Sequence, residues 1–422
     1  MENNSPVPER AYLIGVELPG KNDLDAHESI QELVRLVETA GGMVTGWSLQ
    51  KRNRPGAATF LGKGKIEEIK SVLSDLEVDL VICDRELSPA QARNLGEALD
   101  ARVIDRTQLI LDIFAQRART REGKLQVELA QLNYMLPRLT GMGIQLSRLG
   151  GGIGTRGPGE TKLEADRRRI RKRISDLRHE IDEIKKHRAL LRSGRKKVPF
   201  PLIALVGYTN AGKSTLLNTL TGSKVLVEDK LFATLDPTIR KVVLPDNRTV
   251  LVSDTVGFIS NLPHHLVAAF RATLEEVVEA DLLLHVADAG HPNLEAQVKA
   301  VDKVLSSLDA LAKPTIMVYN KADQIDANYP LGQPTDKEMV LIAAKTGFNI
   351  DGLLQKIAEH LSGKKIIKTF FIPHNKSSLL PLVHGNGKIL RRQHCSDGME
   401  LDVEIDELWA NRISARLSGT NS

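Results

Sequence analysis

The sequence predicts a multidomain α/β protein in which a phosphate-binding-loop domain follows a smaller parallel-sheet α/β domain and two long helices. Apolar β-branched segments alternate with helical periodicity over residues 11–104 and again after residue 199. Two apolar heptad seams lie between these parts, and the motif G-x-x-x-x-G-K-S begins at Gly207. Strands that alternate with helices predict parallel sheets covered by helices. We expect domains at residues 1–106, 107–198, 199–363 and 364–422.

The composition favours a globular protein of a reducing compartment. The chain has 422 residues, enough for two to four domains, and 41% of them are hydrophobic. Its two cysteines, Cys83 and Cys395, lie far apart, so we expect neither a disulfide framework nor a Cys-rich metal site. The N-terminal sequence does not resemble a signal peptide, and no apolar run approaches the roughly 18 residues of a membrane span. We therefore expect a cytoplasmic protein with no membrane span.

The positive charge is concentrated in one segment. The whole chain has a net charge of +5. Residues 117–197 contain 22 Lys or Arg and 9 Asp or Glu, a net charge of +13, so the remainder carries −8. Such asymmetry indicates a segment that binds a polyanion.

The first domain is predicted from alternating strands and helices. Its strands are expected at 11–18, 43–49, 78–83 and 101–104, and its helices at 29–40, at 65–76 and from Ser88 onward. Gly62-Lys63-Gly64-Lys65 precedes a helix and suggests a second phosphate site, but it lacks the full motif. A helix-entry turn is the better interpretation.

Two long helices are predicted to form an antiparallel hairpin between the two α/β domains. The first seam has spacings of 4, 3, 4 and 3, and it comprises Leu125, Leu129, Leu132, Leu136 and Leu139. The second occupies one heptad register and comprises Leu163, Ile170, Ile174, Leu177, Ile181, Ile184 and Leu191. A Gly-rich basic loop, 140–160, connects the helices, and its length is typical of functional loops. Arg148, Arg156 and the loop N–H groups suit contact with an RNA backbone.

The run 167–173 contains six basic residues, and two interpretations stay open. It is either the solvated face of a coiled coil or a phosphate-binding surface. The excess of positive charge over the whole hairpin is hard to explain by balanced salt bridges, and it favours a phosphate-binding surface.

The segment 202–218 predicts a strand, a tight loop and a helix around G-x-x-x-x-G-K-S. Glycines let the backbone wrap an anion, and the N–H groups and helix N-terminus supply partial positive charge. Lys213 can reach the β- and γ-phosphates, and the Ser214 hydroxyl can ligate Mg²⁺. A plain Gly-containing turn is the alternative, and the motifs downstream argue against it.

Three further motifs follow in the order of a GTP site. Thr234 lies where a switch loop supplies a hydroxyl to Mg²⁺, and Asp254-Thr-Val-Gly257 follows a strand. Asp254 can hold the Mg²⁺ shell, while the Gly257 N–H can sense the γ-phosphate. In Asn320-Lys321-Ala-Asp323, the Asp323 carboxylate can accept from both donors of guanine, a pair that adenine lacks.

The candidate site is therefore drawn from five segments of the chain. The residues expected to act in catalysis are Lys213, Thr234 and Gly257, and those expected to ligate the metal are Ser214, Thr234 and Asp254. The nucleotide-binding set comprises Gly207, Tyr208, Thr209, Asn210, Ala211, Gly212, Lys213, Ser214, Thr215, Phe232, Ala233, Thr234, Leu235, Asp236, Asp254, Thr255, Val256, Gly257, Asn320, Lys321, Ala322, Asp323, Ala343, Ala344 and Lys345.

These motifs have the pattern of the GTPase superfamily, and longer stretches of the chain resemble the HflX family. The resemblance covers roughly residues 10–363, including the helical segment, and is weak beyond it. The stretches that carry it are 103–107, 113–120, 123–131, 151–160, 207–214, 231–238, 254–259 and 262–270. Ala343 replaces the Ser usual in the guanine loop, where the adjacent backbone makes the main contact.

The resemblance implies a cytoplasmic GTPase that binds GTP or GDP with Mg²⁺ and contacts the large ribosomal subunit. HflX-like proteins split stalled or stressed 70S ribosomes, and the tip of the helical hairpin is expected to approach the peptidyl-transferase region. We accordingly expect contact with rRNA through residues 117–197 and a monomeric protein, and we leave peripheral membrane association open.

Two residues bear on the rate of hydrolysis. Phe258 stands where Ras-like enzymes carry a water-orienting Gln, so intrinsic hydrolysis is expected to be slow and stimulated by the ribosome. Asn210 suits either a K⁺ ligand beside the phosphates or a simple turn conformation.

The alternative function is a ribosome or RNA anchor in which GTP is mainly a structural switch ligand. A third option is an NTPase that acts on a small molecule through an unrelated N-terminal enzyme domain. The sequence argues against it, because it contains no second set of catalytic residues. The C-terminal part is expected to be a small α+β domain with strands at 369–373 and 399–405. It shows no chemistry of its own, and its histidines, His374, His384 and His394, are not spaced as in a metal site.

Overall fold

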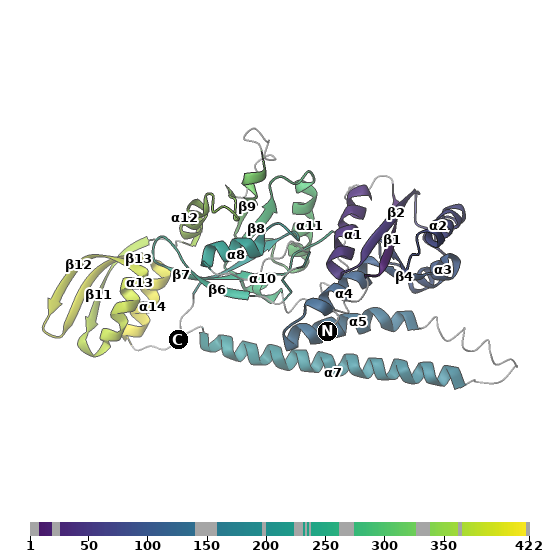
Figure 1. Ribbon diagram of the computed structural model, residues 1–422. Helices are drawn as coiled ribbons and strands as arrows, with labels where there is room; N and C mark the ends of the chain where they lie inside the picture. The colour runs from purple at the N-terminus through teal and green to yellow at the C-terminus, as the bar shows by residue number, and fades with distance from the viewer. Residues whose placement is uncertain are drawn as a thin grey trace, which may run out of the picture.

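The computed structural model confirms the predicted α/β architecture and contains three sheets (Figure 1). It describes residues 8–18, 26–139, 158–195, 200–222, 231–232, 234–235, 238–260, 274–325, 338–361 and 365–418. Among these residues no helix combines the length and apolar character that a membrane crossing needs. Cys83 is buried, Cys395 is exposed, and both are free thiols.

The N-terminal sheet is parallel and has the strand order β2-β1-β3-β4. Alternate residues of β1 point to opposite faces, so Leu13 packs with helices α1 and α4, while Ile14 packs with α2 and α3. The strands are β1 (Arg10–Glu17), β2 (Met43–Lys51), β3 (Leu80–Cys83) and β4 (Arg102–Asp105), and the helices are α1 (Ala26–Ala40), α2 (Lys63–Asp75), α3 (Pro89–Leu99) and α4 (Arg106–Arg117).

Local signals set the helix starts in this domain. Ser88 and Gln91 form a capping box at α3, and the Asp105 carboxylate accepts from the Gln108 N–H at α4. Gly62 is the extended N-cap of α2, as expected for a helix-entry turn.

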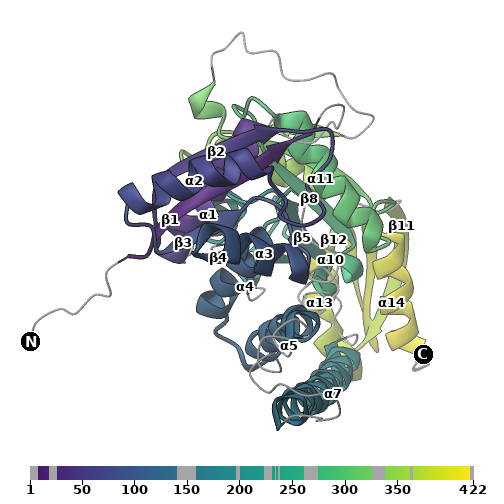
Figure 2. The ribbon, with the colours of Figure 1, turned by 90° about the vertical axis from the view of Figure 1, so that its right-hand side faces the viewer.

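The hairpin is formed by α5 (Arg121–Arg138) and α7 (Pro158–Arg195), which run antiparallel. Leu125 packs with Leu177 and Ile181, and ion pairs join Arg121 to Glu180 and Arg173 to Glu128. Figure 2 shows the two helices nearly end on, beneath the N-terminal sheet. The predicted loop 140–160 lies outside the described residues, except that its last three residues already belong to α7.

Helix α4, at the start of the segment assigned to the hairpin, packs against α1 of the N-terminal sheet. A short break at residues 118–120 separates α4 from α5, where the Thr120 hydroxyl accepts from the Gly123 N–H. The hairpin therefore extends directly from a helix that belongs to the N-terminal core.

The central sheet has the order β10-β9-β8-β5-β7-β6, in which only β6 is antiparallel to its neighbour. The sequence pattern of this domain predicts strands at 202–207, 239–244, 249–253, 281–286, 315–319 and 340–343, and all six are confirmed within two residues. The strands are β5 (Leu202–Gly207), β6 (Thr238–Val243), β7 (Thr249–Asp254), β8 (Leu282–Asp288), β9 (Thr315–Asn320) and β10 (Met339–Leu341), and the helices are α8 (Lys213–Thr221), α10 (Glu275–Glu279), α11 (Leu294–Ser307), η2 (Ala322–Gln324) and α12 (Ile350–Leu361).

The C-terminal part is a three-stranded antiparallel sheet of order β11-β13-β12 with helices against it. The sequence predicted an α+β domain and two of its three strands, whereas β12 is too polar to predict. The elements are β11 (Lys365–Pro373), η3 (His374–Leu379), α13 (Leu380–Asn386), β12 (Gly387–Cys395), β13 (Gly398–Asp406) and α14 (Glu407–Ser418). The three histidines named above are exposed, and the described residues hold no His, Cys, Asp or Glu cluster suited to a metal.

The N-terminal and central sheets share one continuous apolar core. Leu109 and Phe114 of α4 belong to the same buried cluster as Phe232 and Phe258 of the central domain. The rings of Phe114 and Phe232 meet edge to face with centroids 4.7 Å apart. The candidate nucleotide site is thus built against the N-terminal domain.

Candidate functional site

The phosphate-binding loop connects β5 to α8 and requires glycine at both ends. At Gly207 a Cβ atom would lie 2.1 Å from the Val286 carbonyl oxygen. At Gly212 the backbone is left-handed, with φ of 94°, and a Cβ would lie 2.2 Å from the Asn320 amide nitrogen. Asn210 is exposed and also left-handed, at φ of 61°, a conformation that Asn tolerates well.

The Lys213 amine lies inside this loop. Its Nζ donates to the carbonyl oxygens of Gly207 at 3.0 Å and Tyr208 at 2.7 Å. Burial lowers the pKa of Lys213 to about 8, although the Asp254 carboxylate opposes the shift. The amine is therefore positioned where an anion cradled by the loop would meet it.

Three oxygen-bearing side chains converge beside the loop, from the start of α8, the segment around Thr234 and the end of β7. The Ser214 hydroxyl donates to Asp254 Oδ2 at 2.6 Å, and the Thr234 hydroxyl donates to the same atom at 2.9 Å. The two hydroxyl oxygens are 3.0 Å apart. The structure thus brings together the three residues that the sequence predicts as metal ligands.

The Asp254 carboxylate carries a sign of an additional ligand. Burial raises its pKa, and the nearby Lys213 charge and the two hydroxyl donors oppose that shift. Its Oδ1 atom is buried and has no hydrogen-bond partner within the described ranges. Two hydroxyls and one carboxylate are a donor set that suits Mg²⁺, which prefers oxygen ligands and keeps several waters. The residues present therefore fit the metal.

Asn320 joins the phosphate loop to the segment expected to bind guanine. Its amide nitrogen donates to the Ala211 carbonyl at 2.9 Å, and its amide oxygen accepts from the Ala344 N–H at 2.9 Å. The Thr219 hydroxyl of α8 donates to the Ala344 carbonyl at 2.7 Å. Asn320 is 3% exposed, so its role in this arrangement is to hold two loops together.

The remaining residues that the sequence predicts to bind guanine lie at the carboxyl ends of β9 and β10. Lys321 is left-handed, and its amine pairs with Asp288 of β8 at 2.7 Å. Asp323 is exposed on η2, and Lys345 is exposed beyond β10. Sequence reasoning missed Asp288, although a carboxylate at the end of a neighbouring parallel strand is the signal that identifies it.

Several side chains in the predicted nucleotide-binding set point elsewhere. Phe232, Leu235 and Val256 are buried in the core shared by the two domains. The Thr255 hydroxyl donates to the Leu205 carbonyl, and the Tyr208 side chain reaches the N-terminal domain. Ala233 and Asp236 lie outside the described residues. Of this set, Tyr208, Phe232, Leu235, Thr255 and Val256 can therefore contribute to nucleotide binding through their backbone rather than their side chains.

The core also explains Phe258. It is 1% exposed and packs in the shared cluster, while its backbone bonds to Gly207 and Thr209 at the start of the phosphate loop. Gly257 directly precedes it, and a Cβ there would lie 2.8 Å from Thr209 Cγ2 and 3.2 Å from Lys213 Nζ. Only glycine fits against the loop at this position.

Family models match nearly the whole chain. They are described as GTP-binding GTPase N-terminal over residues 27–115, GTP-binding GTPase Middle Region over 117–195, 50S ribosome-binding GTPase over 202–321 and HflX C-terminal domain over 333–422. The similarity therefore extends through the C-terminal part, where the motifs alone gave only a weak resemblance.

Individual proteins give the same result. The chain is 49% identical over 405 residues to "GTPase HflX" of Caldanaerobacter subterraneus subsp. tengcongensis, covering 96% of this chain and 93% of that protein. It is 44% identical over 374 residues to "GTPase HflX" of Escherichia coli strain K12, covering 88% and 87%. A GTP-binding protein from Sulfolobus solfataricus, solved in complex with GDP, is 26% identical with a TM-score of 0.44, covering 83% and 98%. The chain belongs to the HflX family of GTPases.

Proposed function

We propose that this GTPase binds the large ribosomal subunit and uses its GTP-bound state to separate stalled or stressed 70S ribosomes into subunits. The observation that carries the proposal is the basic helical hairpin, attached through α4 to the core that also packs against the nucleotide site. The family model for residues 202–321 is described as a 50S ribosome-binding GTPase, which supports the choice of partner. A protein with this partner acts in the cytoplasm, and we propose that it does so as a monomer.

We propose that the phosphate loop and the three convergent oxygens hold Mg·GTP. Lys213 would contact the β- and γ-phosphates, and Ser214, Thr234 and Asp254 would hold Mg²⁺, directly or through its waters. When bound, Mg²⁺ neutralises charge on the phosphate oxygens. Gly257 lies so close to Thr209 of the phosphate loop that a Cβ would not fit, and we propose that its N–H detects the γ-phosphate.

Guanine would be recognised at the ends of β9 and β10. The Asp323 carboxylate would accept the paired N–H donors of the base, and the backbone after Ala343 would donate to its carbonyl oxygen. Lys321 would lie along the base, oriented by its ion pair with Asp288. Asn320 would keep the base-binding and phosphate-binding loops in register.

Hydrolysis by the isolated protein is expected to be slow. The side chain after Gly257 is a buried Phe258, which offers no group to orient the attacking water. We propose that contact with the ribosome orients the attacking water. We consider two roles for Asn210. It would ligate a K⁺ ion beside the phosphates, or it would only fit the turn, which its left-handed backbone suits equally well. Equal turnover in K⁺ and Na⁺ buffers would leave the turn as its only role.

The hairpin is proposed to contact rRNA through residues 117–197. Side chains in the basic run of α7 divide into two classes. Five of these side chains are exposed, but Arg173 pairs with Glu128 of α5 at 2.7 Å, across the hairpin. The other four make no such contact with α5, namely Arg168, Arg169, Arg171 and Lys172, and Arg169 lies 3.8 Å from Asp166 of its own helix. Exposed cations of one sign along a helix suit a phosphate backbone.

The alternative is a ribosome anchor for which GTP is a structural ligand. The intact set of Lys213, Ser214, Thr234 and Asp254 favours turnover, because together these residues would hold Mg²⁺ and the phosphates in the arrangement that hydrolysis requires. The test is to measure binding to 50S and 30S particles with GTP, a non-hydrolysable analogue and GDP, together with GTP turnover. We expect 50S-selective, GTP-dependent binding and faster turnover on the particle. Equal binding in all nucleotide states with unchanged turnover would support the anchor.

A further inference from the structure

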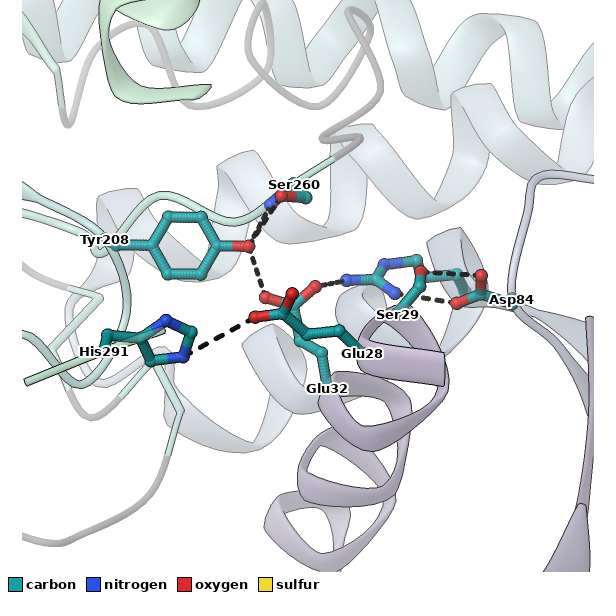
Figure 3. A network of polar contacts seen from close by, with 8 residues as sticks. Glu28, Ser29, Glu32, Asp84, Tyr208, Ser260 and His291 are labelled. Carbon is teal, nitrogen blue, oxygen red and sulfur yellow. Dashed lines mark hydrogen bonds and ion pairs between the residues drawn. The ribbon is translucent and has the colours of Figure 1, made fainter. Parts of the chain in front are cut away.

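Two neighbouring side chains of the phosphate loop carry a hydroxyl group, and they differ in their hydrogen bonds. Figure 3 shows the Tyr208 hydroxyl bonded to Glu32 of α1 and to Ser260. Thr209 directly follows Tyr208 and is 7% exposed. Its Oγ1 atom is buried, yet it has no hydrogen-bond partner within the described ranges. The Thr209 hydroxyl therefore has its hydrogen-bonding capacity left for a ligand of the loop.

A buried hydroxyl without a partner needs an explanation. It has lost its hydrogen bonds to water on folding and has gained none within the protein, which destabilises the fold. Such groups are uncommon in proteins, and a functional role or an absent water or ion often accounts for them. Beside the same loop, Asp254 Oδ1 is a second buried oxygen without a partner in the described chain, and the proposed Mg²⁺ accounts for it. For a hydroxyl donor in a phosphate-binding loop, the matching ligand is a phosphate oxygen.

The backbone and its neighbours fix the place of Thr209. Its N–H donates to the Phe258 carbonyl at 2.7 Å. A Cβ atom on Gly257 would lie 2.9 Å from Thr209 Cα, 2.8 Å from Thr209 Cγ2 and 3.2 Å from Lys213 Nζ. Thr209 and the Lys213 amine thus lie on either side of the same small region in front of Gly257.

This region corresponds to the terminal phosphate of the nucleotide. Lys213 would contact the β- and γ-phosphates, and the Gly257 N–H would detect the γ-phosphate. The other end of the loop faces the guanine segment, since the Asn320 amide donates to the Ala211 carbonyl at 2.9 Å. Thr209 therefore lies at the γ-phosphate end of the loop rather than at the base end.

The Thr209 side chain is held in place before a phosphate binds. Thr carries two heavy atoms on Cβ and has few χ1 rotamers, so packing of Cγ2 against Gly257 restricts the orientation of the hydroxyl. A donor that is fixed in advance needs no reorganisation when negative charge develops beside it. Hydrogen bonds from a hydroxyl to an anionic oxygen are also stronger than those between neutral groups.

We propose that the Thr209 hydroxyl donates a hydrogen bond to an oxygen of the terminal phosphate of GTP. Thr209 would thereby favour GTP over GDP, which lacks this phosphate, and would help to stabilise the charge on the transferred phosphoryl group. The proposal rests on the binding of Mg·GTP proposed above. It adds a side-chain contact to a loop whose other donors are backbone N–H groups and the Lys213 amine.

The test compares the affinities of the full chain for a non-hydrolysable GTP analogue and for GDP, and measures kcat/KM for GTP. Thr209→Val replaces the hydroxyl with a methyl group of similar size, and Thr209→Ala removes it without adding bulk. In both variants, affinity for the analogue and kcat/KM should fall by roughly tenfold or more, while GDP affinity changes less than about twofold. Thr209→Ser keeps the hydroxyl and should stay within about threefold of the original in all three measurements.

Ser253 of β7 supplies a matched control. Its hydroxyl is also buried and without a partner in the described part of the chain, but it lies on the face of β7 opposite to Asp254. Ser253→Ala should preserve the ratio of the two affinities. Lys213→Ala tests the site itself, because loss of an amine that contacts both phosphates should weaken GDP and the analogue together.

The role of Thr209 would be overturned by an unchanged preference for the analogue in Thr209→Val. A native preference in Thr209→Ala, with a loss confined to Thr209→Val, would also overturn it, since bulk rather than a missing bond would then be the cause. Equal loss of both nucleotides, or a loss in Thr209→Ser as large as in Thr209→Val, would show that Thr209 only shapes the loop. If Lys213→Ala left both affinities unchanged, the proposed phosphate site would fail as well.

Discussion

Lys213 has a buried amine whose protonation should control nucleotide affinity. Its pKa is lowered to about 8, because burial disfavours the charged form. Bound phosphate favours the charged amine and raises the pKa again. Binding should therefore take up a proton above pH 8.

GDP affinity is accordingly expected to fall as the pH rises through about 8, by up to about tenfold per pH unit. The sign follows because the free protein loses the Lys213 proton before the complex does. Titrations with a fluorescent GDP between about pH 7 and about pH 9 would measure this. A flat profile would mean that the free amine stays charged throughout, contrary to the effect of its burial.

Guanine selectivity should depend on Asp323. Asp323→Asn replaces one acceptor with a donor, so GDP affinity should fall on the order of 100-fold while xanthosine diphosphate gains affinity. Asp309→Asn is a suitable control, because Asp309 is exposed in the same domain and its left-handed backbone accepts Asn. An unchanged preference for GDP in Asp323→Asn would show that guanine is recognised elsewhere.

Only some residues of the nucleotide site and its surroundings could be predicted from the sequence. Lys213, Ser214 and Asp254 could be predicted because each must present one functional group next to a strand end. The contact between Glu32 and Tyr208 could not, since 176 positions separate the two residues and neither belongs to a motif that names the other. Only the packing of α1 against the central domain brings them together.

Among the helices and strands, the hairpin of α5 and α7 was the easiest to predict from the sequence. Its heptad seam was predictable, and Leu125, Leu177 and Ile181 form the expected cluster. The separate helix α4 was not, because its apolar residues continue a helical pattern and only the N-terminal sheet determines where they pack. Strand β12 was missed for the opposite reason, since most of its residues are exposed and polar.

The apolar seam of the hairpin should be essential for ribosome binding and dispensable for nucleotide binding. Leu177 is fully buried, so Leu177→Ala should destabilise the hairpin by about 2–4 kcal/mol. We expect a lower melting temperature of the helical signal and weaker ribosome binding, with GDP affinity retained. Loss of GDP binding would instead indicate that the hairpin and the nucleotide site fold as one unit.

The exposed cations of α7 should set the salt dependence of ribosome binding. Replacing Arg168, Arg169, Arg171 and Lys172 with Gln should weaken binding and lower the slope against log salt by roughly 0.7–0.9 for each phosphate that the protein no longer neutralises. Arg173 is kept because its pair with Glu128 stabilises the hairpin.

The matched control removes four exposed lysines from other elements, namely Lys70, Lys299, Lys303 and Lys388. It changes the net charge equally and should preserve the slope. Equal slopes in both variants would mean that the basic run is the solvated face of a helical pair.

At the scale of the whole molecule, the nucleotide site and the hairpin meet through one shared core. Phe232 of the switch segment packs on Phe114 of α4, and α4 is followed directly by the hairpin. We therefore expect a conformational change in the switch segment to affect the hairpin through this packed contact. The nucleotide motifs and the heptad seams predicted the two parts, whereas their contact required the folded structure.

The central claim is that the GTP-bound protein separates ribosomal subunits, and light scattering of purified 70S ribosomes tests it most directly. Scattering falls when the particles dissociate, so each nucleotide state can be followed in the same mixture. We predict a fall with GTP or a non-hydrolysable analogue and little change with GDP. Stable scattering in every nucleotide state, with the protein bound to the ribosome, would contradict the account.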